Sequence, residues 1–363
     1  MIYIACFIFF FTILQLIIAL VNIIFYPKLP AGTLIERPLV SILIPARNEE
    51  KNIGNILDDI LHQDYTEIEV IVFNDISTDR TAEIVREYAL ADGRITLTDS
   101  DFLPEGWLGK NWACQSLSKK AKGDFLLFLD ADVRIGNELI LNAVSFAKHF
   151  KLALVSIFPK QIIKTIGEKI TVPNMNYILL SLLPLILVRK LGNPSIAAAN
   201  GQFMFFDSRI YKSMQPHLKM KNNKVEDIGI SRYLKSEKQR IACLVGDNTI
   251  QCRMYNGFND AVNGFSKNVT AFFGNSLILA LVFWFITSFG FLFVLVELPL
   301  YLFIVYLVTS IISRIVISRV SEQEVTENIF LIIPMQISLG LFIYHSFMNK
   351  NIKTFRWKGR DIK

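Results

Sequence analysis

Long stretches without a charged side chain lie at both ends of the chain and frame a central region of mixed polarity. Residues 1–27 contain none, and neither do residues 268–296, 298–313 and 329–349. About 20 apolar helical residues span the roughly 30 Å hydrocarbon core of a bilayer. We therefore predict a transmembrane anchor over residues 1–27 and hydrophobic helices over about 271–296, 298–318 and 329–348, with a tight hairpin at residues 297–299.

Two alternatives fit these apolar stretches less well. Buried helices of a soluble core are seldom this long and this free of charge. A cleaved signal peptide needs a basic start and a shorter apolar stretch, and residues 1–27 have neither.

A shorter apolar stretch lies at residues 177–188, with Pro184 inside it and Arg189 and Lys190 behind it. Twelve residues are too few to cross a bilayer. The segment is either a core helix or an element lying in the plane of the membrane. We favour an interfacial segment within residues 170–190, because its neighbours are already predicted to be membrane-tethered.

The central region, residues 37–267, alternates strand-like and helix-like patterns. Apolar strand patterns cover residues 40–45, 69–74, 95–98 and 124–129, and amphipathic helical patterns cover 52–63, 79–90, 110–121 and 138–150. Such alternation predicts an α/β fold whose mostly parallel sheet is covered by helices on both faces. Ligands of these sheets bind at the carboxyl ends of the strands.

Composition and charge support a membrane protein rather than a nucleic-acid binder. The chain is 52% hydrophobic and only 19% charged, which is atypical of a purely soluble or a disordered protein. Most of its net charge of +6 lies in a basic tail, residues 349–363, with six Lys or Arg and one Asp. The rest is nearly neutral, so we expect no nucleic-acid partner and a tail that contacts an anionic membrane surface.

The cysteine and histidine pattern does not indicate a structural zinc site. The four cysteines form no C-x-x-C pair, and the four histidines are dispersed. We expect the cysteines to be small buried hydrophobic residues in a reducing compartment.

Polar residues follow the predicted strands at the edge where a ligand would bind. The segments are 45–50, 74–79 and 130–132, together with Gly109 and Lys110 before a helix. Carboxylates with one lysine can hold a divalent cation and a diphosphate. Of two D-x-D patterns, Asp130/Asp132 ends a hydrophobic strand, whereas Asp99/Asp101 lies in a loop and is expected to be solvated.

These motifs, in this order, resemble the family-two glycosyltransferases of the GT-A fold. Residues 43–50, the Asn74-Asp75-x-Ser77-Thr78-Asp79 box, Gly109-Lys110 and residues 129–132 carry the resemblance, supported by residues 200–203, 225–227, 253–255 and 264–268. With the apolar segments and the tail motif at 357–360, the whole chain is similar to bacterial membrane glycosyltransferases that act on carotenoids.

The resemblance implies a role for each matching residue. The donor would be a UDP-sugar, with UDP-glucose expected, and the metal would be Mg²⁺ or Mn²⁺. Asp132 would bind the metal, and Asp227 would be the base that deprotonates the acceptor. The other expected donor-site residues are Pro45, Ala46 and Glu49 lining the nucleotide cleft, Asp75 on the uracil, Lys110 on the diphosphate and Asp130 on the sugar or ribose.

The role of Asp227 has alternatives. It could serve only as a first-turn acid of a helix over residues 228–235, and Glu226 is a less favoured base. A carboxylate acceptor is already ionised at neutral pH and needs no base. A true base at Asp227 therefore points to an alcohol acceptor rather than a carotenoid acid.

Two further departures from the family pattern are visible. Ile76 stands where the family usually has glycine, and the Q-x-x-R-W box of processive synthases is absent, with Gly264-Phe265-Ser266-Lys267 in the corresponding helix. The second departure favours a single sugar transfer over polymerisation.

We expect an inverting, metal-dependent transferase that glycosylates a membrane lipid, such as a carotenoid acid or alcohol, in the cell membrane. Other acceptors remain open: a hopanoid, a diacylglycerol or a ceramide-like lipid. A non-catalytic scaffold with a decayed transferase domain is also open, but the presence of Asp75, Asp130, Asp132 and Asp227 together weighs against it.

The predicted membrane topology contains one conflict. Lys28 and Arg37 follow the anchor and place the catalytic domain in the cytoplasm. Three later crossings would put the basic tail outside, against the same rule. Pro334 and Gln336 make the last apolar segment the candidate for incomplete crossing.

Overall fold

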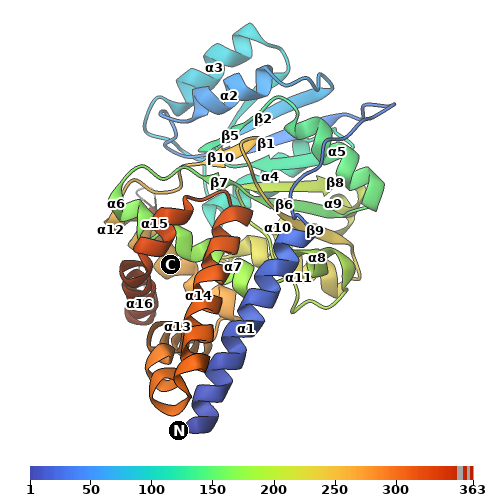
Figure 1. The fold of residues 1–363 in the computed structure, drawn as a ribbon. Coiled ribbons are helices and arrows are strands. Elements are labelled where there is room, and N and C mark those ends of the chain that lie inside the picture. The colour runs from blue at the N-terminus through green and yellow to red at the C-terminus, as the bar shows by residue number, and fades with distance from the viewer. Residues whose placement is uncertain (350–354, 358–359, 363) are drawn as a thin grey trace.

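A seven-stranded sheet organises the central region of the computed structural model, which describes residues 1–349, 355–357 and 360–362 (Figure 1). The strand order is β3-β2-β1-β4-β8-β6-β9. Only β8 runs antiparallel to its neighbours β4 and β6, so the predicted mostly parallel sheet is confirmed. The strands are β1 (Val40–Ala46), β2 (Ile68–Asn74), β3 (Ile95–Asp99), β4 (Phe125–Leu129), β6 (Leu154–Phe158), β8 (Phe203–Asp207) and β9 (Ile241–Val245).

Helices cover both faces of this sheet, because alternate residues of a strand point to opposite faces. In β1, Ile42 and Ile44 belong to one hydrophobic cluster and Leu43 to the other. The first cluster takes in α2 (Ile53–Leu61), α3 (Thr81–Ala91) and α5 (Leu139–Phe150). The second takes in α4 (Gly109–Lys120), α9 (Ser208–Met214) and α11 (Glu226–Ser236). The predicted helices of this region thus form within about two residues of their expected bounds.

A small second sheet brings distant segments to the ligand-binding edge. Its order is β5-β10-β7, with β5 (Val133–Ile135), β10 (Ile250–Cys252) and β7 (Lys160–Gln161). Cys252 pairs with Val133 across the antiparallel β5–β10 ladder. The residues that follow β10 therefore lie beside the residues that precede β5.

Among the residues that the structure describes, three helices are long and apolar enough to cross a membrane, judged by length and composition: α1 (Ile2–Ile24), α13 (Leu277–Glu297) and α14 (Leu300–Val320). Only Leu298 and Pro299 separate α13 from α14, and the tight hairpin expected there stays a prediction. In Figure 1, α1 and α14 lie side by side below the α/β domain, with the N-terminus at the far end. The Lys28 ammonium pairs with Glu322, just beyond α14, and the other oxygen of Glu322 lies 3.1 Å from Lys160 in β7. These ion pairs join both helices to the domain.

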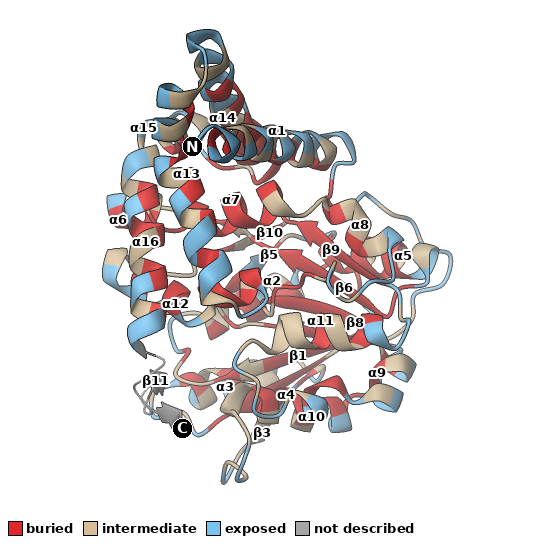
Figure 2. Cartoon of the chain, turned by 90° about the horizontal axis from the view of Figure 1, so that it is seen from below, coloured by how far each residue is buried: buried red, intermediate tan, exposed pale blue. Residues whose placement is uncertain are grey.

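The last apolar segment differs from these three helices. It forms α15 (Val325–Phe330) and α16 (Ile332–Asn349), and the apolar run of α16, Ile332–Met348, is too short to count among the candidate spans. Figure 2 shows α16 running crosswise to α1. Incomplete crossing by this segment stays a prediction.

The short apolar stretch expected to be either a core helix or an in-plane element forms α7 (Pro173–Leu182) and α8 (Leu185–Lys190). Every residue of α7 except Leu182 is buried (Figure 2), and the helix packs against α1, α14 and α16. This burial is what the core-helix alternative describes for α7. The in-plane position of residues 170–190 stays a prediction.

The remaining short elements complete the chain. They are α6 (Ile166–Lys169), α10 (Pro216–Lys219), α12 (Phe258–Asn268) and the 3₁₀ turn η1 (Val269–Phe273). In the predicted basic tail, β11 (Phe355–Trp357) pairs with β12 (Arg360–Ile362), while its side chains lie outside the described residues. All four cysteines are free thiols, and all but Cys6 are buried.

Candidate active site

The residues predicted to line the nucleotide cleft lie at the carboxyl ends of β1 and β2. Ala46 pairs with Asn74 in the parallel ladder, and the Asp75 N–H donates to the Ala46 carbonyl at 2.8 Å. Asp75 is 3% exposed and Glu49 is 8% exposed. The Glu49 N–H donates to the Thr81 hydroxyl at 2.7 Å. Pro45, Ala46, Glu49 and Asp75 are thus brought together, as the sequence predicts.

Ile76 adopts a left-handed backbone conformation, with φ of +54°. This conformation costs an L-residue about 1–2 kcal/mol and costs glycine nothing. The turn is held by Arg47, whose guanidinium donates to the Ile76 carbonyl at 3.0 Å, and by Asn74, whose side chain accepts from the Ser77 N–H at 3.1 Å. Isoleucine in place of the family's glycine therefore keeps the turn but adds backbone strain to it.

A second cluster forms where β4 ends, around Lys110 in the first turn of α4. Its ammonium lies 2.8 Å from one Asp130 oxygen and 2.9 Å from the other, and 3.6 Å from Glu226. Burial lowers the pKa of Lys110, but the carboxylates of Asp130 and Glu226 outweigh burial and hold the pKa above its usual value. Lys110 is therefore a permanent cation, positioned to face a second anion such as a diphosphate.

Glu226 and Asp227 begin α11 beside this lysine. Both Asp227 oxygens accept backbone N–H groups, one from Gly201 at 3.0 Å and one from Ile228 at 2.7 Å. Burial raises the pKa of Glu226 to about 7, opposed by the Lys110 ammonium and assisted by the Asp227 charge. Burial also raises the pKa of Asp227. The pair is suited to exchange a proton near neutral pH.

Gly201 lies where these groups converge. A Cβ at this position would stand 3.2 Å from the Lys110 ammonium, 3.3 Å from Glu226 and 3.7 Å from Asp227. The Gly201 carbonyl also accepts from Lys110 at 3.3 Å. The sequence motif at 200–203 therefore supplies backbone to the site, a role that no local pattern indicates.

Asp132, the predicted metal ligand, lies next to Cys252. Burial raises the pKa of the Cys252 thiol, and the charge of Asp132 raises it further. The Gln202 amide donates to the Cys252 sulfur at 2.8 Å. Asp132 is therefore close to β10.

The carboxylates present suit a cation that is completed by its substrate. Across the described part of the chain, no three His, Cys, Asp or Glu residues group tightly enough to hold a metal alone. Mg²⁺ and similar ions are commonly bound by one or two carboxylates plus substrate phosphates and water. Asp132, with Asp130 nearby in sequence, fits that arrangement.

Tyr255 belongs to the segment 253–255 that supports the family resemblance, but the sequence assigns it no role. Its ring packs onto the bare backbone of α12 at Gly264, where an added Cβ would stand 2.2 Å from a ring carbon and 2.3 Å from the hydroxyl. The ring also packs edge-on against Phe265, with centroids 4.8 Å apart. Burial raises the pKa of Tyr255, and the charges of Asp260 and Asp132 raise it further. Tyr255 thus lies between α12 and the Asp132 side of the site.

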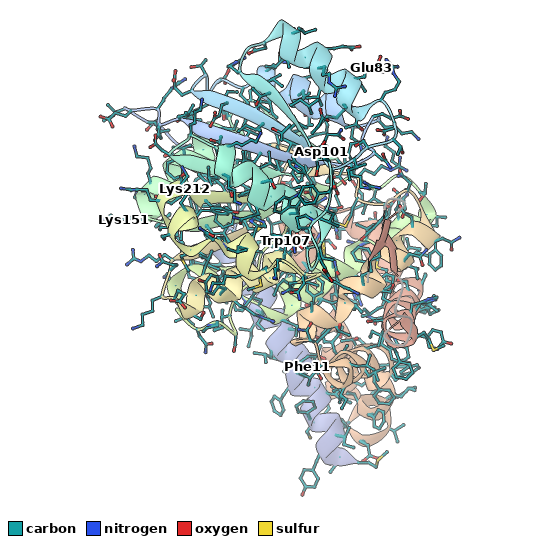
Figure 3. All side chains as sticks on the ribbon, turned by 180° about the vertical axis from the view of Figure 1, so that it is seen from behind. Phe11, Glu83, Asp101, Trp107, Lys151 and Lys212 are labelled. Atoms are coloured by element: carbon teal, nitrogen blue, oxygen red, sulfur yellow. The ribbon has the colours of Figure 1, made fainter. Side chains whose placement is uncertain are left out.

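The second D-x-D pattern lies apart from the Lys110 cluster. Asp99 is exposed and is held by Asn74 and Arg86 at 2.7 and 2.9 Å. Asp101 lies on the exposed loop between β3 and α4, with Trp107 further along the same loop (Figure 3). Both acids are exposed, as expected, but the loop position predicted for Asp99 is wrong, because Asp99 is the last residue of β3.

Comparison with known proteins matches residues 41–214, just under half of the chain, to glycosyl transferase family 2. The 4,4'-diaponeurosporenoate glycosyltransferase of Staphylococcus haemolyticus is 28% identical over 233 residues, 63% of this chain and 60% of that protein. Its namesake in Staphylococcus aureus (strain USA300) is 26% identical over 270 residues, 71% of this chain and 68% of that protein. The chain thus spans less than two thirds of the first of these relatives.

A mannosyltransferase from Pyrobaculum calidifontis, solved in complex with GDP-Man and Mn²⁺, shares the fold. Its TM-score is 0.55 at 16% identity, covering 95% of this chain and all of that one. The predicted GT-A fold is thereby confirmed.

Proposed function

Because residues 41–214 match glycosyl transferase family 2, we propose that the protein transfers a single sugar, with inversion, from UDP-glucose to a membrane lipid. The observation that carries this proposal is the Lys110 cluster. A partly buried cation between Asp130 and the Glu226–Asp227 pair lies at the strand ends where GT-A enzymes bind their donors. It supplies a positive charge for the leaving diphosphate and carboxylates for the acceptor in one place.

On the donor side, Asp75 contacts the uracil in a cleft lined by Pro45, Ala46 and Glu49. The Lys110 ammonium orients the diphosphate and stabilises the charge that develops there as the sugar leaves. Asp130 faces the sugar or ribose. Asp132 would hold Mg²⁺ or Mn²⁺, and the bound ion would neutralise phosphate charge; the mannosyltransferase that shares the fold is solved with Mn²⁺.

On the acceptor side, Asp227 accepts the proton of an acceptor hydroxyl. Its two backbone N–H donors fix the carboxylate while leaving further lone pairs for the acceptor. A carotenoid acid or alcohol is the acceptor we propose, since two relatives are named for a carotenoid carboxylate. A carboxylate acceptor attacks without losing a proton.

The proposed topology uses α1, α13 and α14 as the crossings. With the domain on the cytoplasmic side after α1, one crossing by α13 and a second by α14 return the chain to that side. Residues after α14, including the basic tail, then remain cytoplasmic, as the positive-inside rule requires. The conflict noted from the sequence disappears if α16 does not cross.

The test measures transfer by membranes from a heterologous host that expresses the full chain. Membranes receive radiolabelled UDP-glucose, Mn²⁺ and a carotenoid acid or alcohol, and products are identified by mass spectrometry of the lipid extract. We expect a monoglycosylated carotenoid that is lost in Asp132→Ala. Asp101→Ala, which changes the exposed D-x-D pattern, is the matched control and should keep full activity. No glycosylated lipid with any acceptor would favour the scaffold hypothesis.

A further inference from the structure

A cavity of about 50 Å³ lies where the chain leaves α1 and meets the catalytic domain. Its walls come from the end of α1 with Phe25 and Lys28, from α5 with Phe146, from α8 with Leu185 and Arg189, and from β9 with Cys243. The Val245 N–H donates to the Pro27 carbonyl at 2.7 Å, so the wall from α1 is tied to the edge of β9. The cavity is therefore built from elements far apart in sequence that are fixed to each other.

Arg189 places an uncompensated positive charge at this cavity. Its Nη1 atom is buried and has no hydrogen-bond partner. Its guanidinium stacks on Phe150, 3.7 Å from the ring centroid. Within the part of the chain that the structure describes, no carboxylate forms an ion pair with it. Because no acidic group opposes the effect, burial lowers the pKa of Arg189.

The other cations here do not share this situation. The Lys28 ammonium, also on the cavity wall, is bound to Glu322. Lys190 is exposed, 5.6 Å above the Phe25 ring. A buried donor without a partner costs about 1–3 kcal/mol, and more when it is charged. Arg189 is thus the group for which an anion in the cavity would recover the most free energy.

The surroundings indicate which anion can reach it. Ile24, Phe25 and Tyr26 at the end of α1 are 72%, 52% and 65% exposed. Aromatic side chains at the end of a membrane helix lie at the level of the lipid headgroups. The cavity opens beside this aromatic group, and its position at headgroup depth rests on the proposed membrane crossing by α1.

We propose that this cavity binds the phosphate of an anionic membrane phospholipid, with the Arg189 guanidinium as its principal donor. A water needs about 10–15 Å³ of such space, so the cavity has room for a phosphate group but not for acyl chains. The chains lie along the exposed apolar side chains of α1. Guanidinium binds phosphate with two parallel hydrogen bonds, which satisfies the buried Nη1. The bound lipid joins α1 to α8 and stabilises the docking of the domain on the membrane helices.

The test uses the purified full chain in a zwitterionic detergent. Dioleoyl phosphatidylglycerol or dioleoyl phosphatidylcholine is added, and thermal unfolding and lipid adducts in native mass spectrometry are measured. We expect phosphatidylglycerol to raise Tm and to persist as an adduct, and phosphatidylcholine to do neither. Arg189→Gln should weaken the apparent affinity for phosphatidylglycerol about tenfold or more. Arg209→Gln, which changes a side chain that is 92% exposed, is the matched control and should bind like the parent.

Several outcomes would overturn the proposal. Equal binding of the two lipids, or unchanged phosphatidylglycerol binding in Arg189→Gln, would exclude an anion site at Arg189. An equal rise in Tm with inorganic phosphate alone would exclude a lipid site. If Arg189→Gln does not fold, Arg189→Lys keeps the charge without the planar fork and should still weaken binding. Glucosyl transfer is assayed separately, so failure of lipid binding with transfer intact refutes only this proposal.

Discussion

Replacing each of the two neighbouring carboxylates at the start of α11 with its amide separates the catalytic role of this pair from its contribution to stability. Asp227→Asn removes the proposed base, and Glu226→Gln removes its neighbour while leaving Lys110 paired with Asp130. For an alcohol acceptor, loss of a general base lowers the rate by about 10²–10⁴. We expect that loss in Asp227→Asn and a smaller one in Glu226→Gln. For a carboxylate acceptor, Asp227→Asn should keep most of its rate, because no proton has to be removed.

The structure also sets the stability cost of each variant. Both Asp227 oxygens accept backbone N–H groups, from Gly201 and Ile228. Asparagine has one acceptor oxygen, so one N–H then faces an NH₂ group. A hydrogen bond to a charged group contributes about 1.5–3 kcal/mol. Asp227→Asn should lose roughly that free energy of unfolding and show a lower Tm, whereas Glu226→Gln removes a buried charge and should lose less.

The pH dependence of the rate follows from the raised pKa of Glu226, about 7. Transfer to an alcohol requires the deprotonated form of the Glu226–Asp227 pair. The rate on an alcohol acceptor should therefore rise as pH passes upward through about 7 and then level off. Because the two carboxyls interact, this limb belongs to the pair. Removing the Asp227 charge should lower the pKa of Glu226, since a neighbouring like charge raises it.

The assay follows transfer from UDP-glucose to a polyene alcohol and to the matching polyene acid, between pH 5 and 9, with UDP binding by calorimetry as the control. UDP affinity should stay unchanged in both variants. A large rate loss in Glu226→Gln with near-normal Asp227→Asn would refute the reasoning and assign the base to Glu226. A loss of UDP binding in Asp227→Asn would move that residue to the donor side.

Four further predictions test the metal, the Tyr255 contact, the turn after β2 and the membrane topology. Asp132→Ala should abolish transfer without loss of membrane insertion, and full activity in excess EDTA would contradict the metal assignment. Gly264→Ala should lower transfer because the added methyl displaces the Tyr255 ring. If the only role of Gly264 is to leave room for that ring, the double variant Tyr255→Ala/Gly264→Ala should have the same rate as Tyr255→Ala alone. Ile76→Asn should raise the free energy of unfolding by up to about 1 kcal/mol in a denaturant titration, because asparagine tolerates the left-handed conformation, and a fall would show that the Ile76 side chain stabilises the turn. For topology, a cysteine at Lys358 should be labelled by an impermeant reagent only after permeabilisation, and labelling of intact cells would show that the tail is outside.

The sequence by itself determined the local elements and the positions of the candidate donor-site residues on them. The bounds of the first four strands and the helices that follow them were predictable because the spacing of apolar side chains encodes which face of each element is buried. Asp75 and Asp130 could be placed at the strand ends for the same reason, since parallel strands end at a common edge, and Lys110 could be placed at the start of a helix. The three long apolar helices needed only length and composition.

Only the tertiary structure decided which distant segments complete the site. Gly201 reaches Lys110 and Asp227 because β8 enters the sheet antiparallel beside β4, and Tyr255 approaches Asp132 because β10 pairs with β5. The burial of α7 was open in the same way: a short apolar helix has one pattern whether it packs in a core or lies on a bilayer. Hydrophobic periodicity records how a segment meets its surroundings, but which segment provides those surroundings depends on long-range packing that no local pattern contains.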